Sequence, residues 1–266
     1  MEDDQEGASS VEPQLFVTAF ARGLAVIRAF GPERPHPTLS DVAKVTGLPR
    51  ATVRRCLHTL VELGYAESNG RFFSLTPKIL TLGYSYLSAS PLPRLAQPFL
   101  ERVSERSHES CSLSILDGEE IVYVARSATR RIMSVDLAIG SRLPAFCTSM
   151  GRVLLAALPA EELQRRLGEM KLTRYTRHTV TEREALLPLL DAAREQGYAI
   201  ADQELEEGLR SLAVPVFGAG GKVVAAMNLS TQAARVELEQ LRGPLLDLLR
   251  LAAAELSAVL GGYRPG

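Results

Sequence analysis

The most chemically specific residues of this chain are arginines in a short segment. Arg50, Arg54 and Arg55 lie within Leu-Pro-Arg-Ala-Thr-Val-Arg-Arg at 48–55, and Arg71 directly follows Asn-Gly. A guanidinium is a rigid fork of donors that matches the O6/N7 edge of guanine or two phosphate oxygens. The Thr52 hydroxyl suits a phosphate, and its methyl group suits a thymine methyl. These residue types together indicate nucleic-acid recognition, with a solvated helix face as the alternative for each arginine.

The charge distribution supports this interpretation. Residues 14–78 hold nine basic and four acidic side chains, a charge of +5, although the whole chain has a formal charge of −1. Residues 1–13 carry five acidic side chains and no basic one, −5, and the rest holds 21 basic against 22 acidic, −1. A basic module attracts a phosphate backbone. An acidic leader that is poor in apolar residues is typical of a disordered tail.

Helical periodicity predicts how the arginines are positioned. Apolar residues at helical spacing predict a first helix over 16–30, which Gly31-Pro32 ends. Ser40 is expected to cap a second helix over 41–46, with Val42 and Val45 facing inward. A third helix is expected from Pro49 to about Leu63, with Val53, Leu57, Leu60 and Leu63 on one face and Gly64 as its C-cap.

A β-hairpin is predicted after the third helix. Two β-prone runs flank Asn69-Gly70, a pair that favours a type I′ turn. Three helices followed by a hairpin form a winged helix-turn-helix, whose third helix enters the major groove of double-stranded DNA. We therefore expect operator DNA as a partner. The candidate contact residues are Arg50, Ala51, Thr52, Arg54, Arg55 and Arg71.

The remainder of the chain predicts helices around an antiparallel sheet, an α+β fold. The expected helices span 79–90, 95–107, 152–157, 160–169, 182–196 and 236–260, and the expected strands span 111–116, 120–126, 132–138, 198–200, 212–217 and 223–230. The predicted organisation is a disordered acidic tail (1–13), a DNA-binding domain (14–76), a linker helix (77–94) and a sensor and oligomerisation domain (95–263).

The sensor domain shows no pattern typical of catalysis. The segment Gly218–Lys222 superficially suggests a phosphate loop, but it joins two predicted strands and therefore predicts a hairpin turn. No catalytic, metal or cofactor site is expected, because neither the sequence motifs nor the isolated histidines supply one. The three cysteines form no CxxC pair and suit a reducing cytoplasm. The sequence has no apolar run of about 18 residues, the length that a membrane-spanning helix needs, so no membrane contact is expected.

Small-anion binding is the chemistry that remains for this domain. Thr148 and Ser149 precede a predicted helix, whose free N–H groups suit a carboxylate, although ordinary capping is the alternative. Polar residues at strand positions either line a pocket or lie at sheet edges: Asp202, Glu204, Ser211, Asn228 and Ser230.

Several stretches resemble the isocitrate-lyase-regulator (IclR) family of bacterial transcription factors. They are Phe-Ala-Arg-Gly-Leu-Ala-Val-Ile at 20–27, the turn-helix at 48–55, Leu-Pro-Ala-Phe-Cys-Thr-Ser-Met-Gly-Arg-Val-Leu-Leu-Ala at 143–156, and Asp-Gln-Glu-Leu-Glu-Glu-Gly-Leu-Arg-Ser-Leu-Ala-Val-Pro-Val at 202–216. The last two are similar to the branch that controls aromatic catabolism through protocatechuate, 4-hydroxybenzoate and the β-ketoadipate pathway.

This resemblance implies a GAF-like sensor domain and a homodimer, often a dimer of dimers. It also implies a carboxylate site at the backbone N–H groups of Ser149 and Met150, completed by Ser211, Asn228 and Ser230, with Asp202 nearby. Arg142 either counters a second carboxylate or lies at the surface. The chain departs from many members by having Ser211 in place of a cysteine and Ala201 in place of an aspartate.

The predicted function is a regulator of aromatic-acid catabolism genes whose operator binding responds to a small aromatic or dicarboxylic acid. One alternative is a regulator of the same family that responds to an unrelated carboxylate. The others are an enzyme with an appended DNA-binding module and an architectural DNA-binding protein.

Overall fold

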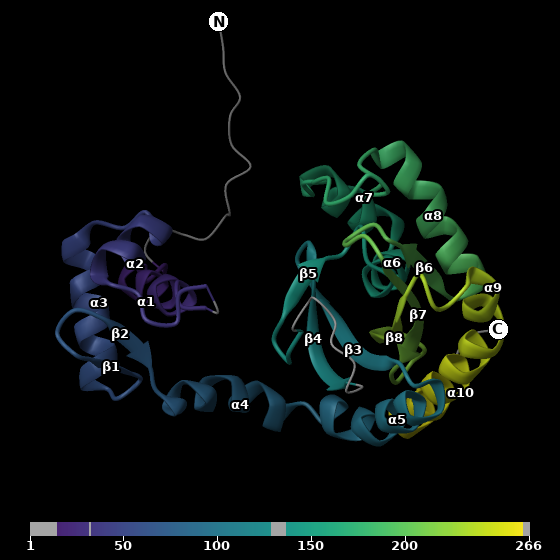
Figure 1. The fold of residues 1–266 in the computed structure, drawn as a ribbon, viewed down its shortest axis with the longest axis horizontal. Helices are drawn as coiled ribbons and strands as arrows, with labels where there is room; N and C mark the ends of the chain where they lie inside the picture. The colour runs from purple at the N-terminus through teal and green to yellow at the C-terminus, as the bar shows by residue number, and fades with distance from the viewer. Residues whose placement is uncertain (1–14, 32, 129–136, 263–266) are drawn as a thin grey trace, which may run out of the picture. The chain divides into compact units, whose positions relative to one another are not determined.

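The computed structural model describes residues 15–31, 33–128 and 137–262. The chain forms two compact units, Met1–Ala89 and Ser90–Gly266 (Figure 1). Within the described residues, no helix has both the length and the apolar character needed to cross a membrane.

The first unit is a three-helix bundle followed by a short hairpin. Its elements are α1 (Thr18–Arg28), α2 (Leu39–Thr46), α3 (Arg50–Glu62), β1 (Ala66–Ser68), β2 (Phe73–Leu75), the 3₁₀ turn η1 (Pro77–Ile79) and α4 (Leu80–Ala89). The core of the bundle is formed by Val26, Val42, Val53, Leu57 and Leu60, all of them buried. The expected order of three helices and a hairpin is confirmed.

The start of α2 differs from the sequence prediction. Thr38, and not Ser40, is the N-cap: its hydroxyl accepts a hydrogen bond from the Asp41 N–H at 3.3 Å, and the Asp41 carboxylate accepts one from the Thr38 N–H at 2.8 Å. This reciprocal capping box satisfies two otherwise unpaired donors, so it outcompetes the single bond that Ser40 offers. Val45, expected to face inward, is 46% exposed.

The hairpin turn also differs from the predicted one. The register pairs Ser68 with Phe73, so the loop has four residues instead of two. A type I′ turn needs positive φ at both central residues, but of Asn69 and Gly70 only the glycine has it, at +95°. The Asn69 side-chain oxygen instead accepts hydrogen bonds from the N–H groups of Arg71 and Phe72, at 3.2 and 2.9 Å. An asparagine-centred turn therefore replaces the type I′ turn.

The second unit is built on a six-stranded sheet in which each neighbouring pair is antiparallel, in the order β5-β4-β3-β8-β7-β6. The strands are β3 (Ser110–Asp117), β4 (Glu120–Ser127), β5 (Arg142–Pro144), β6 (Ala199–Asp202), β7 (Leu209–Phe217) and β8 (Val223–Gln232). Together with its helices, this sheet confirms the α+β class.

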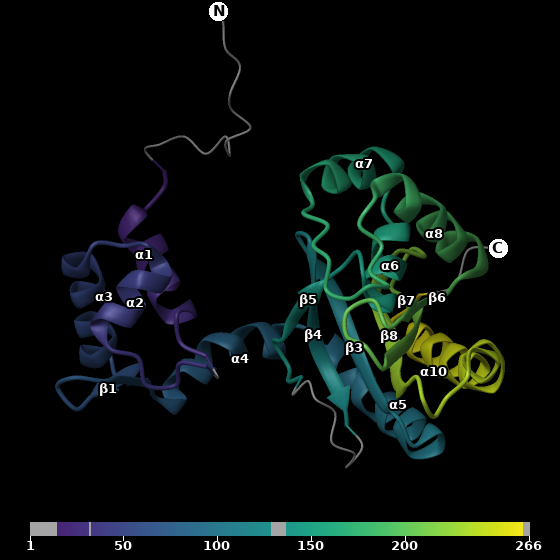
Figure 2. The ribbon, with the colours of Figure 1, turned by 45° about the horizontal axis from the view of Figure 1, so that its top comes forward.

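Helices cover both faces of the sheet (Figure 2). On one face, α5 (Leu92–Ser107) and α10 (Leu246–Val259) build an apolar core with residues such as Leu100, Leu113 and Leu249. On the other face, α6 (Ser149–Ala156), α7 (Ala160–Glu169) and α8 (Arg183–Gln196) build a second core around Phe146 and Leu190. The sheet therefore has two buried faces.

Two further predictions are corrected or limited by the structure, and one is confirmed. The C-terminal helix expected over 236–260 is interrupted: α9 (Leu238–Gln240) and a π-helical segment, η2 (Leu241–Leu245), precede α10, because Gly243 has non-helical dihedral angles and proline follows it. Strand β5 was not predicted, and most of the strand expected over 132–138 lies outside the described residues. Gly218–Lys222 joins β7 to β8 as a hairpin turn, as expected.

Candidate functional site

The exposed surface of α3 brings together four of the six candidate DNA-contact residues. Arg50, Ala51, Arg54 and Arg55 are exposed, while Thr52 is half-buried. Within the described residues, the three arginines take part in no ion pair. Free guanidinium groups on an exposed helix are available to phosphates and base edges.

Arg71 lies apart from α3, in the loop of the hairpin. Its guanidinium carbon lies 5.2 Å from the centre of the Phe72 ring, a cation–π contact that leaves the charge exposed. This is the position from which a wing contacts the DNA backbone or the minor groove.

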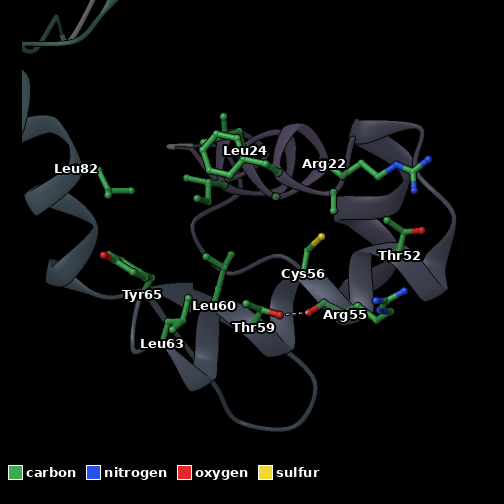
Figure 3. A pocket seen from close by; sticks show the side chains of 14 residues that line it. Arg22, Leu24, Thr52, Arg55, Cys56, Thr59, Leu60, Leu63, Tyr65 and Leu82 are labelled. Atoms are coloured by element: carbon green, nitrogen blue, oxygen red, sulfur yellow. Dashed lines mark hydrogen bonds between the residues drawn. The ribbon is translucent and has the colours of Figure 1, made fainter. Parts of the chain in front are cut away.

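A hollow of about 500 Å³ lies between α1, α3 and α4 in the first unit (Figure 3). Phe20 and Leu24 of α1 line it and are 68% and 43% exposed. Figure 3 shows Arg22 and Arg55 at one end of this groove and Leu82 at the other. The apolar stripe of the first helix, which the sequence predicted by its spacing, is therefore largely an exposed groove wall and not core.

Leu63 is also part of the groove. The sequence placed it on the buried face of the third helix, but α3 ends at Glu62 and Leu63 is 54% exposed. An apolar surface of this kind on a small module indicates an interaction site.

In the second unit, a small cavity of about 30 Å³ lies between the first turn of α6 and the sheet. It brings together the five residues that the family resemblance assigns to the carboxylate site, from α6, β7 and β8: Ser149, Met150, Ser211, Asn228 and Ser230. The remaining lining is largely apolar and comprises Tyr123, Leu137, Leu143, Cys147, Thr148, Ala201, Glu204, Leu205 and Leu209. Convergent polar groups in an apolar cavity are the usual form of a small-molecule site.

The start of α6 is fixed by capping and by close packing. The Thr148 hydroxyl accepts a hydrogen bond from the Gly151 N–H at 3.2 Å, and the Thr148 carbonyl accepts one from the Arg152 N–H at 3.0 Å. The N–H groups of Ser149 and Met150 precede the first intrahelical bond and are free to bind an anion. A Cβ atom on Gly151 would lie 2.0 Å from the Ala145 carbonyl oxygen, so only glycine allows this approach.

The polar side chains on the floor of the cavity are held in place by hydrogen bonds. The hydroxyls of Ser149 and Ser211 are hydrogen-bonded at 2.9 Å. The Asn228 oxygen accepts a bond from the Ser112 N–H at 3.1 Å, and the Asn228 amide donates to the Ser230 hydroxyl at 3.0 Å. These bonds join α6 to β7 and β8 to β3, so the cavity walls are mutually fixed.

Two candidate effector residues lie elsewhere. The Asp202 carboxylate pairs with the Arg210 guanidinium, at 2.7 and 3.2 Å, and Asp202 is not among the residues that line the cavity. Arg142 lies on β5 and pairs with the carboxylates of Glu120 and Asp117, at 2.6 and 2.8 Å. The structure therefore does not bring these two side chains to the cavity.

The carboxylate that does line the cavity belongs to Glu204. It pairs with Arg152 of α6 through two N···O contacts of 2.6 Å, and the two side chains are 8% and 3% exposed. Arg152 also donates to the Phe146 carbonyl at 3.0 Å. Glu204 was predicted among the polar strand residues, but no role was predicted for Arg152, because a lone arginine in a helix carries no signal that it is buried.

Burial keeps two ionisable groups of the cavity neutral. Desolvation raises the pKa of the Tyr123 hydroxyl to about 12 and that of the Cys147 thiol also to about 12. Both groups are therefore protonated near neutral pH, and the cavity offers hydroxyl and N–H donors beside the ion pair. Within the described residues, no cluster of histidine, cysteine, aspartate and glutamate has the arrangement of a metal site.

The comparison with protein families covers most of the chain. Residues 19–70 match the IclR helix-turn-helix domain, and residues 84–258 match the C-terminal domain of bacterial IclR transcriptional regulators. The Pca regulon regulatory protein of Pseudomonas putida is 49% identical over 93% of this chain and 85% of its own length. The p-hydroxybenzoate hydroxylase transcriptional activator of Acinetobacter baylyi is 37% identical over 94% of both chains.

Solved structures show the same architecture. A protein of Rhodococcus sp. RHA1 is 53% identical, with a TM-score of 0.82 over 92% of this chain and 98% of its own. An IclR homologue from Microbacterium hydrocarbonoxydans, crystallised with 4-hydroxybenzoate, is 29% identical, with a TM-score of 0.78 over 91% and 99% of the two chains. The chain thus belongs to the IclR family of bacterial transcriptional regulators.

Proposed function

We propose that this regulator controls genes of aromatic-acid breakdown and that the cavity beneath α6 binds its effector, a small aromatic carboxylate. The carboxylate would accept hydrogen bonds from the N–H groups of Ser149 and Met150, with the hydroxyls of Ser211 and Ser230 beside it. The convergence of these donors in one buried cavity is the observation that carries the proposal. The names of the two relatives, which refer to Pca genes and to p-hydroxybenzoate hydroxylase, support the aromatic class.

Effector binding must rearrange the cavity. A volume of about 30 Å³ is far below the several hundred Å³ of typical ligand sites. The leucines at 137, 205 and 209 line it, and the hydrogen bond between Ser149 and Ser211 crosses it. An aromatic acid would take the place of that bond and displace the leucines. A conformational change of this kind lets the effector favour one DNA-binding state over another, provided that it binds the two states differently.

In the DNA complex, Arg50 and Arg54 of α3 would contact bases or phosphates in the major groove. Ala51, Thr52 and Arg55 would lie close to the DNA beside them. Arg71 in the hairpin loop would contact the neighbouring DNA backbone. A dimer would place two α3 helices roughly 34 Å apart, one DNA turn.

We assign the groove between α1, α3 and α4 to a second copy of this chain, because its exposed Phe20 and Leu24 require an apolar partner. A further pairing of dimers through the sensor units remains a prediction.

The proposed function is tested by thermal unfolding with 4-hydroxybenzoate, protocatechuate and β-ketoadipate. A ligand at about 100 times its Kd stabilises the folded state by about 2.7 kcal/mol. For a unit of this size that raises the Tm by about 5–10 °C. The same ligand should change the affinity for operator DNA. If no aromatic acid raises the Tm but another carboxylate does, the protein is a ligand-responsive regulator of this family, and the proposed role in aromatic-acid breakdown is wrong.

The groove is tested separately by replacing Leu24 with Glu. The introduced carboxylate would be buried in the proposed dimer contact. Light scattering should therefore show a monomer in place of a dimer, and operator binding should be weaker. A variant that keeps the wild-type mass would place the dimer contact elsewhere.

A further inference from the structure

Beyond the residues of the proposed effector site, the polar surface beneath α6 continues onto strands β3 and β4. The Ser114 hydroxyl contacts the Met150 sulfur at 3.1 Å, which shows that Ser114 faces α6. Side chains two residues apart on a strand share a face, so Ser112 faces α6 as well. The strand partner of Ser112 on β8 is Asn228, and its partner on β4 is Arg126. Arg126 therefore belongs to the same face of the sheet as the cavity.

A β-bulge gives Arg126 a second polar neighbour. The register of β3 and β4 shifts between Leu113 and Ser114: Ser114 pairs with Tyr123, whereas Leu113 pairs with Ala125. The extra residue on β4 reverses the alternation of side chains. Tyr123 and Arg126, three positions apart, consequently lie on one face instead of on opposite faces.

One polar atom of each of these two side chains makes no hydrogen bond within the described residues. The Arg126 Nε is the one buried side-chain nitrogen or oxygen in the described part of the chain that makes no hydrogen bond. The Tyr123 side chain is 4% exposed and lines the cavity, and its hydroxyl makes no hydrogen bond within residues 15–31, 33–128 and 137–262. A buried donor without an acceptor costs free energy, so the Arg126 Nε, on the same sheet face as a tyrosine hydroxyl that also makes no hydrogen bond, indicates a missing acceptor.

The spacing across the sheet fits a ligand with two polar ends. Arg126 on β4 and Ser211 on β7 are three strands apart, which is roughly 14 Å. Arg126 does not line the cavity of about 30 Å³, so the rearrangement that admits an aromatic acid would also have to extend the cavity along the sheet to reach the arginine.

We propose that Arg126 and Tyr123 form a second polar end of the effector cavity, which binds the oxygen of a ring substituent while the first turn of α6 binds the carboxylate. This inference rests on the proposed function and narrows the effector class. The preferred ligand is an aromatic acid with a hydroxyl or a second acidic group across the ring, and an unsubstituted aromatic acid binds more weakly.

Isothermal titration of the full chain with 4-hydroxybenzoate and with benzoate tests this assignment. The wild type should bind 4-hydroxybenzoate at least about tenfold more tightly, because benzoate leaves the charged donor unpaired. Arg126→Met should abolish this preference by weakening 4-hydroxybenzoate and sparing benzoate, and Arg126→Lys should restore part of it. Arg106→Met on the exposed face of α5 is the matched control and should keep the preference.

Four outcomes decide the matter. If Arg126→Met weakens both acids equally, Arg126 serves only the fold, and the second polar end is refuted. If the wild type binds both acids equally, the second end is also refuted, while the proposed effector site stands. If the wild type binds neither acid, the proposed function fails and this inference fails with it. If Arg126→Met does not fold, Tyr123→Phe decides: a retained tenfold preference overturns the proposal, and a reduced one supports it.

Discussion

The buried ion pair between Arg152 and Glu204 should be the most sensitive electrostatic contact in the sensor unit. Arg152→Met keeps the approximate length of the side chain and removes its charge. The Glu204 carboxylate would then stay buried, with the Val180 N–H at 3.3 Å as its remaining donor among the contacts described here. Breaking a buried pair by removing one partner costs about 3–5 kcal/mol, because the other charge is left uncompensated. We expect this loss in the free energy of unfolding and, for a unit of this size, a fall in Tm of about 6–20 °C.

The assay is urea and thermal unfolding at pH 7, followed by circular dichroism. The double variant with Glu204→Gln removes the orphaned charge, so it should be clearly more stable than Arg152→Met alone. Arg165→Met is the control: Arg165 pairs with Glu162 at the surface, where such a pair contributes at most about 1 kcal/mol. A loss below about 1 kcal/mol for Arg152→Met, or strict additivity in the double variant, would refute the reasoning.

Three other predictions concern the sites themselves. Arg54→Ala should weaken operator binding by about 1–3 kcal/mol in fluorescence anisotropy if it contacts a base; unchanged affinity and sequence preference would make it a solvated arginine. Ser211→Leu fills the small cavity, so it should abolish the effector response and keep DNA affinity, whereas a retained response would place the effector elsewhere. Because burial raises the pKa of Cys147 to about 12, its thiol is neutral at every pH well below that value. It should therefore resist iodoacetamide at pH 8, while half-buried Cys56 is modified. Mass spectrometry that finds Cys147 labelled first would contradict the burial.

Elements with strong local signals were predictable from the sequence. Helix α3 has a proline at its start, a glycine after its end and apolar residues at helical spacing, and each of these signals acts within a few residues. Thr38 and Ser40 are both plausible N-caps of α2, and their capping energies are close. The reciprocal bond between Thr38 and Asp41 decides in favour of Thr38. The break in the C-terminal helix had a visible signal, Gly243-Pro244, that the long apolar pattern outweighed.

The candidate effector site was predictable only in part. A helix just after Ser149 was predicted from local sequence, although α6 begins three residues before the expected 152–157. The resemblance to the family supplied Ser211, Asn228 and Ser230, which the fold brings to the same cavity. Arg126 could not be predicted, because simple alternation puts it on the face opposite Tyr123. Only the bulge, a property of how two strands pair, brings both side chains to the cavity face. Arg142 and Asp202 have the right charges but are paired with neighbours that sequence spacing does not reveal.

A crystal structure of the full chain with 4-hydroxybenzoate would show directly where the effector binds. We expect the carboxylate at the N–H groups of Ser149 and Met150, with the Ser149–Ser211 hydrogen bond broken and the ring hydroxyl directed toward Arg126 and Tyr123. A ligand bound outside this cavity, or one whose carboxylate makes no contact with the first turn of α6, would contradict it.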